Sequence, residues 1–188
     1  MSCQAATLLN TRPAAWPVRD LVLLGIFAAA AKVSTLLVAL LGGGMNPVTL
    51  LAKNCIFTIL LLVLLFKLRK KGALLLFIAV NMLISLFLLG GTISLLVPML
   101  LGALLAEGAM LLAGGQKHKW TPFLGAAVYD FTSKVMSLGM SLLLMRESPA
   151  LVYIAVPIIG LGYLGSLAGL WFGGRAVKEL RCAGFVSE

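Results

Sequence analysis

The chain has 188 residues, of which 61% are hydrophobic and 11% charged, and its formal net charge is +9. A water-soluble domain of this size does not hide so much apolar surface, so the composition excludes an ordinary soluble protein and indicates an integral membrane protein. The positive charges flank apolar runs, which excludes a nucleic-acid partner and indicates a lipid bilayer instead.

The sequence divides into apolar runs separated by short polar or glycine-rich connections. About 20 apolar residues suffice to cross a bilayer as a helix. We therefore predict an all-α membrane protein, a six-transmembrane-helix bundle over residues 19–177 with polar tails at 1–18 and 178–188. The expected spans cover about residues 19–42, 48–66, 72–89, 93–113, 122–145 and 153–172.

Lysine and arginine gather in alternate connections. The loops at 67–71 and 116–119 and the two tails hold nearly all of the flanking basic residues, whereas the turns at 42–47 and 90–92 hold none. Because basic flanking residues stay in the cytoplasm, this alternation predicts that both termini are cytoplasmic. The three cysteines are scattered without metal or redox spacing, so we expect them to be reduced.

The first span contains small residues and one lysine. Gly25 and Ala29, or alternatively Ala30 and Ser34, lie four residues apart, a spacing that lets two helix backbones approach closely. An equally simple explanation is that the alanines only fill space within a bundle. Lys32 lies deep in the apolar run, where a lysine costs about 3 kcal/mol on insertion scales, so it is expected to face a cavity or a partner.

Ionisable residues inside the spans indicate a binding site. At about 1.5 Å per residue from the nearer external turn, Lys53 lies ~9 Å deep, Lys32 ~15 Å and Lys134 ~18 Å. Asp130 is one helical turn from Lys134, so these two can pair. The remaining positive charge favours a ligand with an anionic group, held mainly by Lys32 and Lys134.

The predicted substrate-binding set also includes Asn46, in the first external turn, and Asn81, within the third span. An alternative is that Lys53 reaches the membrane interface and Lys134 pairs with Asp130, so that only Lys32 needs an explanation. Glu107, nearer the cytoplasmic end, fits a structural use as well as a functional one.

Catalytic motifs are missing from the sequence. There is no GxSG or HExxH motif and no cluster of acids and histidines with metal-ligand spacing, so we expect no enzyme activity, no cofactor and no metal. A GxxxxGK[ST] phosphate loop is also missing. A transporter built from this chain would need an external energy source or an ion gradient.

Several segments resemble a known family. The arrangement of six short spans with cytoplasmic termini resembles the substrate-capture (S) components of energy-coupling factor transporters, and most closely the Trep_Strep group of bacterial membrane proteins. The resemblance covers nearly the whole chain and is carried by RDLVLLGIFAAA, KLRKKGALLLFIAVN, GGTISLLVPMLLGALLAEG, MRES and GSLAGLWFGGRAVKELRCAGF.

This resemblance implies a multi-pass protein of the bacterial cytoplasmic membrane. Small residues of the first helix, here Gly25, Ala28 and Ala29, would dock a membrane-embedded coupling subunit that cytosolic ATPase subunits drive. Many S components carry a clear AxxxA pattern on this helix, whereas the alanine run of this chain fits more than one register. The ligand would be a small-molecule nutrient held near the external face.

The predicted function is thus substrate capture for an energy-coupling factor uptake transporter, with a small anionic or strongly polar substrate. The alternative is a stand-alone ion-coupled carrier or channel that uses Asp130 and Lys134.

Overall fold

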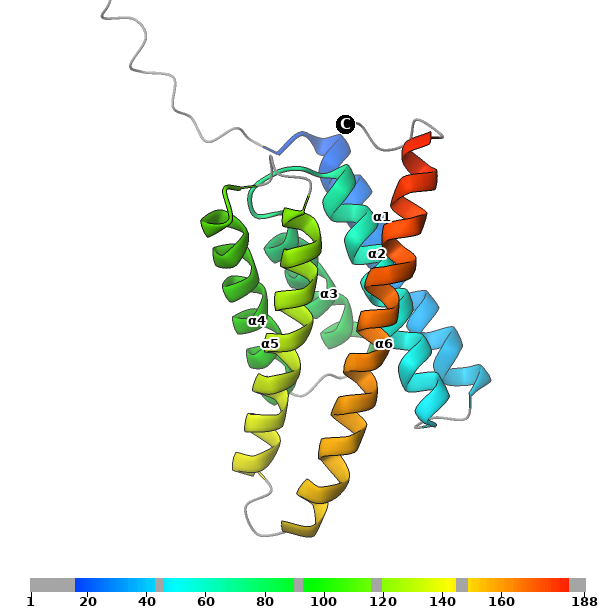
Figure 1. Cartoon of the computed structure of the whole chain (residues 1–188), viewed down its shortest axis with the longest axis vertical. Helices are drawn as coiled ribbons and strands as arrows, with labels where there is room; N and C mark the ends of the chain where they lie inside the picture. The colour runs from blue at the N-terminus through cyan, green and yellow to red at the C-terminus, as the bar shows by residue number, and fades with distance from the viewer. Residues whose placement is uncertain (1–15, 43–45, 90–92, 116–119, 145–148, 183–188) are drawn as a thin grey trace, which may run out of the picture.

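Helices form all of the regular structure in the part of the chain that the computed structural model describes, residues 16–42, 46–89, 93–115, 120–144 and 149–182. Each of the six predicted apolar runs corresponds to one of them, and the first five start and end within one residue of the expected positions (Figure 1). The helices are α1 (Val18–Leu41), α2 (Pro47–Lys67), α3 (Ala73–Leu89), α4 (Ile93–Leu112), α5 (Thr121–Leu144) and α6 (Pro149–Cys182).

Proline and glycine set several helix ends. Asn46 is extended and precedes Pro47, which occupies the first turn of α2, where its missing N–H group costs nothing. At the other end of the bundle, Gly114 and Gly115 follow α4 with φ angles of 96° and 74°. Their N–H groups bond to the carbonyls of Leu111 and Met110, which satisfies the end of the helix with residues that tolerate the left-handed conformation.

The last helix is longer than the sequence predicted. The sixth span was expected to end near Phe172, but α6 continues through Gly173 and Gly174 to Cys182 and has 34 residues. The predicted C-terminal tail therefore begins as helix. Packing explains the two glycines, because a Cβ at Gly173 would lie 3.0 Å from the Leu62 side chain and one at Gly174 would lie 3.2 Å from the Phe123 ring.

Length and apolar composition single out three helices of the described chain as candidate membrane spans, namely α1, α2 and residues Val156–Cys182 of α6. The apolar stretches Ala73–Phe87 and Leu96–Leu112 are shorter. Helix α5, which carries Asp130 and Lys134 in its middle, is not among the candidates. Large apolar side chains are exposed on every side of the bundle, as expected of a surface that faces lipid.

Helix α2 lies at the centre of the packing and contacts α1, α3, α5 and α6. Its residues Leu61–Phe66 are all buried. Helix α6 packs along it through Gly165, Gly169 and Gly173, each four residues after the last. A Cβ at Gly165 or Gly169 would lie 2.7 Å from a backbone carbonyl oxygen of α2, so only glycine allows the two helices to lie this close.

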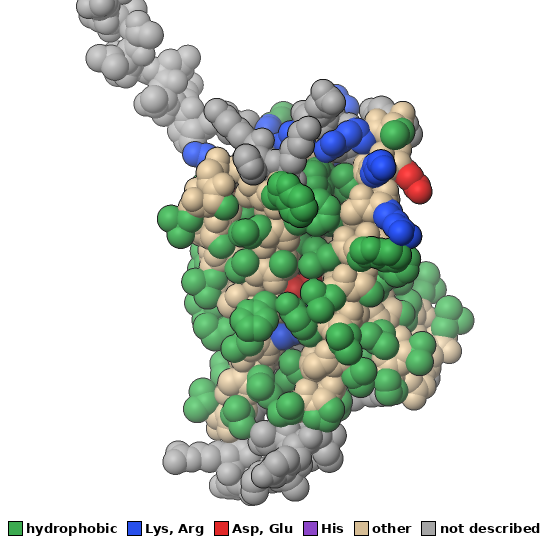
Figure 2. Space-filling model, viewed as in Figure 1, with side chains coloured by type: hydrophobic (Ala, Val, Ile, Leu, Met, Phe, Trp, Pro, Cys, Tyr) green, Lys and Arg blue, Asp and Glu red, His purple; other side chains and the backbone are tan. Residues whose placement is uncertain are grey.

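One end of the bundle is rich in positive charge (Figure 2). The start of α1 and the end of α6 lie together there (Figure 1), and Lys and Arg side chains gather at the same end, whereas the sides are mainly hydrophobic (Figure 2). An ion pair between Asp20 and Lys70, with 2.6 Å between oxygen and nitrogen, joins the start of α1 to the connection between α2 and α3. We call this the basic end. Cys55 and Cys182 are free, and Cys3 lies outside the described residues.

Candidate functional site

A cavity of about 310 Å³ lies between the α1–α2 pair and the α4–α5 pair. Its walls come from the second half of α1, the first halves of α2 and α4, and the middle and second half of α5. Since consecutive helices run in opposite directions, these segments all lie away from the basic end. We call it the central cavity. It is lined by Lys32, Thr35, Lys53, Asn54, Phe57, Pro98, Met99, Tyr129, Asp130, Ser133, Lys134 and Ser137.

All four charged residues of the predicted binding set line this cavity: Lys32, Lys53, Asp130 and Lys134. They come from three different helices. The sequence placed Lys32 and Lys134 at similar depths and Lys53 nearer the surface, and the fold brings all of them to one cavity. The cavity contains three lysines and one aspartate among its walls, so its formal charge is positive.

Asp130 is the most deeply buried of the four, with 5% of its surface exposed. One carboxylate oxygen accepts a 2.8 Å hydrogen bond from the Thr58 hydroxyl of α2. The other lies 3.7 Å from the ammonium nitrogen of Lys134, one helical turn further along α5. The predicted pair of Asp130 and Lys134 is therefore present, and Thr58 adds a neutral partner from a second helix.

Lys134 also connects α5 to α6. Its ammonium group donates a 2.6 Å hydrogen bond to the Ser166 hydroxyl, and Ser166 in turn donates a 3.3 Å bond to the carbonyl of Gly162. A Cβ at Gly162 would lie 3.3 Å from the lysine side chain, so the absence of a side chain there leaves room for Lys134. Its ammonium group lies 5.9 Å from the centre of the Tyr163 ring. One carboxylate, one hydroxyl and one ring thus surround this charge.

Among the described residues, no carboxylate pairs with the ammonium group of Lys32 or of Lys53. The Lys32 ammonium group donates a short hydrogen bond to the Ser85 hydroxyl of α3, a neutral acceptor. Within the described residues, Lys53 has no ion-pair or hydrogen-bond partner, although it is only partly exposed. Lys32 and Lys53 also line a second cavity of about 310 Å³ that adjoins the outer face of α1. The uncompensated charge of the site therefore lies on the α1–α2 side.

The two asparagines of the predicted binding set, Asn46 and Asn81, are not among the residues that line the central cavity. Asn46 is exposed before α2, where its side-chain amide donates a 2.7 Å bond to the carbonyl of Gly42. Asn81 is buried in α3 and donates a 3.1 Å bond to the carbonyl of Phe77. The backbone carbonyl of Asn81 accepts a 2.8 Å bond from the hydroxyl of Ser85, the partner of Lys32, so Asn81 supports the site only through that hydroxyl.

Several site residues were missed by the sequence analysis. Asn54 lines the cavity beside Lys53, whereas Thr58 and Ser166 hold the buried pair from neighbouring helices. A single hydroxyl within an apolar run gives no periodic signal, because its own helix can satisfy it. Only the packing of α2 and α6 on α5 shows that Thr58 and Ser166 serve another helix.

The predicted docking face of α1 is not one surface. Ala28 is fully buried, because it lies on the side of α1 that packs against α2 and α3. It belongs to the core and is withdrawn from the predicted interface. Ala29 is exposed, and a Cβ at Gly25 would meet no atom within 4 Å. Gly25 and Ala29 therefore remain as an open, close-approach surface on the outer side of α1.

Glu107 lies at the basic end, away from the central cavity. One of its carboxylate oxygens accepts a short hydrogen bond from the backbone N–H of Gly72, in the connection between α2 and α3. Gly72 has a φ of 83°, a conformation that favours glycine. This contact ties α4 to that connection and indicates a structural use for Glu107.

Comparison with known proteins identifies the family but no individual relative. No curated protein and no solved structure gives a significant match. A family model described as a hypothetical bacterial integral membrane protein matches residues 18–151, which cover α1 to α5 with the start of α6 and contain every charged residue of the central cavity. The chain therefore belongs to the Trep_Strep family of bacterial integral membrane proteins.

Proposed function

We propose that this chain is the substrate-binding membrane subunit of an energy-coupling factor uptake transporter, and that the central cavity holds its substrate, a small anionic or strongly polar nutrient. The observation that carries the proposal is the pair of lysines, Lys32 and Lys53, which share a cavity of about 310 Å³ without a carboxylate partner among the described residues.

The charges favour an anion. A lysine that stays charged away from water needs a partner, and Asp130 is already engaged by Lys134 and Thr58. A carboxylate or phosphate between Lys32 and Lys53 would supply the missing negative charge. Ligand pockets in proteins measure about 300–1,000 Å³, so the cavity suits a small metabolite.

Energy coupling must come from another protein under this proposal, because the sequence has no phosphate loop. The outer side of α1 offers a surface for a membrane-embedded coupling subunit. Gly25 and Ala29 lie there four residues apart, and among the described residues no side chain covers them. Small residues at that spacing permit close helix packing. The resemblance to S components points to the same helix.

All six helices cross the membrane in this proposal, with the basic end in the cytoplasm. The central cavity then lies in the outer half of the bilayer, where a substrate from outside reaches it. Cysteine labelling in intact cells tests this orientation after the three native cysteines are replaced by serine. Lys70→Cys should be protected from a membrane-impermeant reagent, and Asn46→Cys, before α2, should react. The reverse pattern would overturn the orientation.

Co-purification tests the functional assignment. The full chain, tagged and extracted in mild detergent from its own cells, should bring down a second membrane protein together with ATPase subunits. Native mass spectrometry of the same sample should show a retained small molecule. If the purified chain alone accumulates that molecule in liposomes under an ion gradient, the assignment as a capture subunit is wrong.

A stand-alone ion-coupled carrier is the second candidate. It is favoured by the buried pair of Asp130 and Lys134, since intramembrane carboxylates commonly act as proton or cation sites. In a carrier, Asp130→Asn should abolish gradient-driven uptake in liposomes by the chain alone. In a capture subunit, no such uptake exists to be lost.

A further inference from the structure

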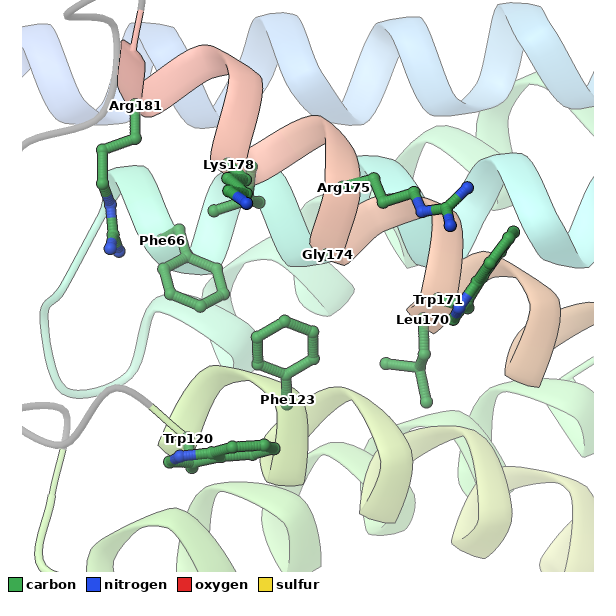
Figure 3. A pocket seen from close by; sticks show the side chains of 10 residues that line it. Phe66, Trp120, Phe123, Leu170, Trp171, Gly174, Arg175, Lys178 and Arg181 are labelled. Atoms are coloured by element: carbon green, nitrogen blue, oxygen red, sulfur yellow. The ribbon is translucent and has the colours of Figure 1, made fainter.

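A groove of about 510 Å³ at the basic end belongs to neither the central cavity nor the predicted docking face. It lies between the C-terminal half of α6, the end of α2 and the start of α5. Figure 3 shows its side chains: the rings of Phe66 and Phe123 lie next to each other on its floor, while Lys178 and Arg181 project from α6 above them. We call it the basic groove.

The floor of the basic groove is apolar and aromatic. The Phe66 and Phe123 rings pack edge to face with 5.3 Å between their centres, and Trp120 lies 6.1 Å from Phe123. Trp120 leaves 75% of its surface exposed and Trp171 leaves 55%. Exposed tryptophans at the end of a membrane bundle commonly mark the level of the lipid head groups.

Three cations line the groove above this floor: Arg175, Lys178 and Arg181. The Arg175 guanidinium is held 3.7 Å from the centre of the Trp171 ring. The Nε atom of Arg181 is buried and has no hydrogen-bond partner among the described residues. None of the described residues that line the groove is acidic, and Glu179, which lies between Lys178 and Arg181 in sequence, does not line it. Among the described residues, the three cations therefore have no acidic partner in the lining of the groove, and Arg181 Nε has no hydrogen-bond acceptor.

From this arrangement we propose that the basic groove binds an anionic phospholipid, with an acyl chain on the apolar floor and the phosphate against Lys178 and Arg181. A soluble anion would leave the aromatic floor exposed. A zwitterionic lipid would bring its own positive charge toward three cations. Basic pockets between transmembrane helices on the cytoplasmic side are a recurring type of anionic-lipid site. The proposal does not depend on the transport function.

Native mass spectrometry of the full chain in detergent tests the proposal by titration with dioleoylphosphatidylglycerol, and in parallel with dioleoylphosphatidylcholine. We expect the wild-type chain to retain phosphatidylglycerol in preference to phosphatidylcholine. Lys178→Gln with Arg181→Gln should weaken phosphatidylglycerol binding about tenfold or more, because two surface charges that face one head group are lost. The melting temperature in detergent should stay unchanged, since Lys178 is exposed and Arg181 partly so.

The matched control is Arg19→Gln with Lys71→Gln, which removes two exposed charges at the same end of the bundle but outside the groove. It should leave phosphatidylglycerol binding nearly unchanged. Equal weakening by the control pair, or equal retention of both lipids, would overturn the proposal. Displacement of phosphatidylglycerol by millimolar glycerol 3-phosphate would also overturn it, because the groove would then be a site for soluble anions.

Discussion

The Thr58 hydroxyl on α2 donates a 2.8 Å hydrogen bond to the Asp130 carboxylate on α5. Both residues are buried, with 0% and 5% of their surfaces exposed. The bond crosses the centre of the bundle and holds a carboxylate away from water. It therefore fixes the position of Asp130 beside the central cavity as well as the position of α5 against α2.

Replacing Thr58 tests the strength of this connection. Thr58→Val keeps the shape of the side chain but leaves a buried carboxylate with one partner fewer, so it should lower the free energy of unfolding by about 1 kcal/mol, with values near 2 kcal/mol for an acceptor that stays charged. Thr58→Ser keeps the hydroxyl and should lose less. Thermal unfolding in detergent compares the two. Equal melting temperatures for the serine and valine variants would show that the hydrogen bond is not what stabilises this site.

Removing one member of the pair of Asp130 and Lys134 should cost more than removing both. Lys134→Met leaves Asp130 buried without its cation, and breaking a buried pair in this way typically costs about 3–5 kcal/mol. Combining it with Asp130→Asn removes the stranded charge and should restore much of the lost stability. The measurement is a double-mutant cycle of melting temperatures. If the loss of stability in the double variant equalled the sum of the losses in Lys134→Met and Asp130→Asn alone, the two residues would not interact.

The glycine contacts between α6 and α2 predict opposite effects of alanine at two positions of one helix. At Gly169 a Cβ would lie 2.7 Å from the Cys55 carbonyl oxygen, so Gly169→Ala should push the helices apart and cost about 1–3 kcal/mol. At Gly160 a Cβ would meet no atom within 4 Å, so Gly160→Ala should leave stability unchanged or raise it by about 0.5–1 kcal/mol. Thermal unfolding of the two variants checks the contrast, and similar melting temperatures would contradict it.

The cavity lysines predict how substrate binding responds to loss of charge. The sequence favoured Lys32 and Lys134, but the described contacts leave Lys32 and Lys53 without a carboxylate. Lys32→Met and Lys53→Met should each weaken retention of the bound molecule by about 2 kcal/mol, which is more than tenfold. Native mass spectrometry of the purified chain gives the retained fraction. Full retention by both variants would remove the argument for an anionic substrate.

If Gly25 and Ala29 form the docking surface, a bulky residue there should block binding of the coupling subunit and leave binding of the small molecule intact. Ala29→Trp places a large ring where the coupling subunit is proposed to approach, so it should abolish co-purification of that subunit while the small molecule stays bound. Ala30→Trp is the matched control, because Ala30 is also exposed but lies about 100° further around the helix. Loss of the coupling subunit in the Ala30 variant alone would place the docking surface on a neighbouring side of α1.

The sequence predicted the helices well because their apolar runs are separated by proline, glycine and basic residues, which mark helix ends directly. The prediction was wrong where one residue type has two uses. The sixth span was predicted to end near Phe172, whereas the glycines that follow it let α6 continue in close contact with α2 and α5. Whether all six helices cross the membrane stays a prediction.

The candidate site was partly predictable for a related reason. A charge inside an apolar run is costly, so Lys32, Lys53, Asp130 and Lys134 stood out without a structure. The residues that hold these charges did not stand out. The hydroxyls of Ser85 and Ser166 cost little free energy to bury, and serine is common in membrane helices. Ala28 was misassigned because an alanine run looks alike on every side of a helix. The neighbours α2 and α3 decide which side is covered.

The unbroken length of α6 links the two ends of the molecule mechanically. At about 1.5 Å per residue its 34 residues measure roughly 51 Å, well beyond the ~30 Å hydrocarbon layer. A tilt about its glycine contacts with α2 would move Gly162, beside Lys134, and Arg181, in the basic groove, in opposite directions. A lipid in the groove and a molecule in the central cavity should then alter each other's affinity, and by linkage the factor must be the same in both directions.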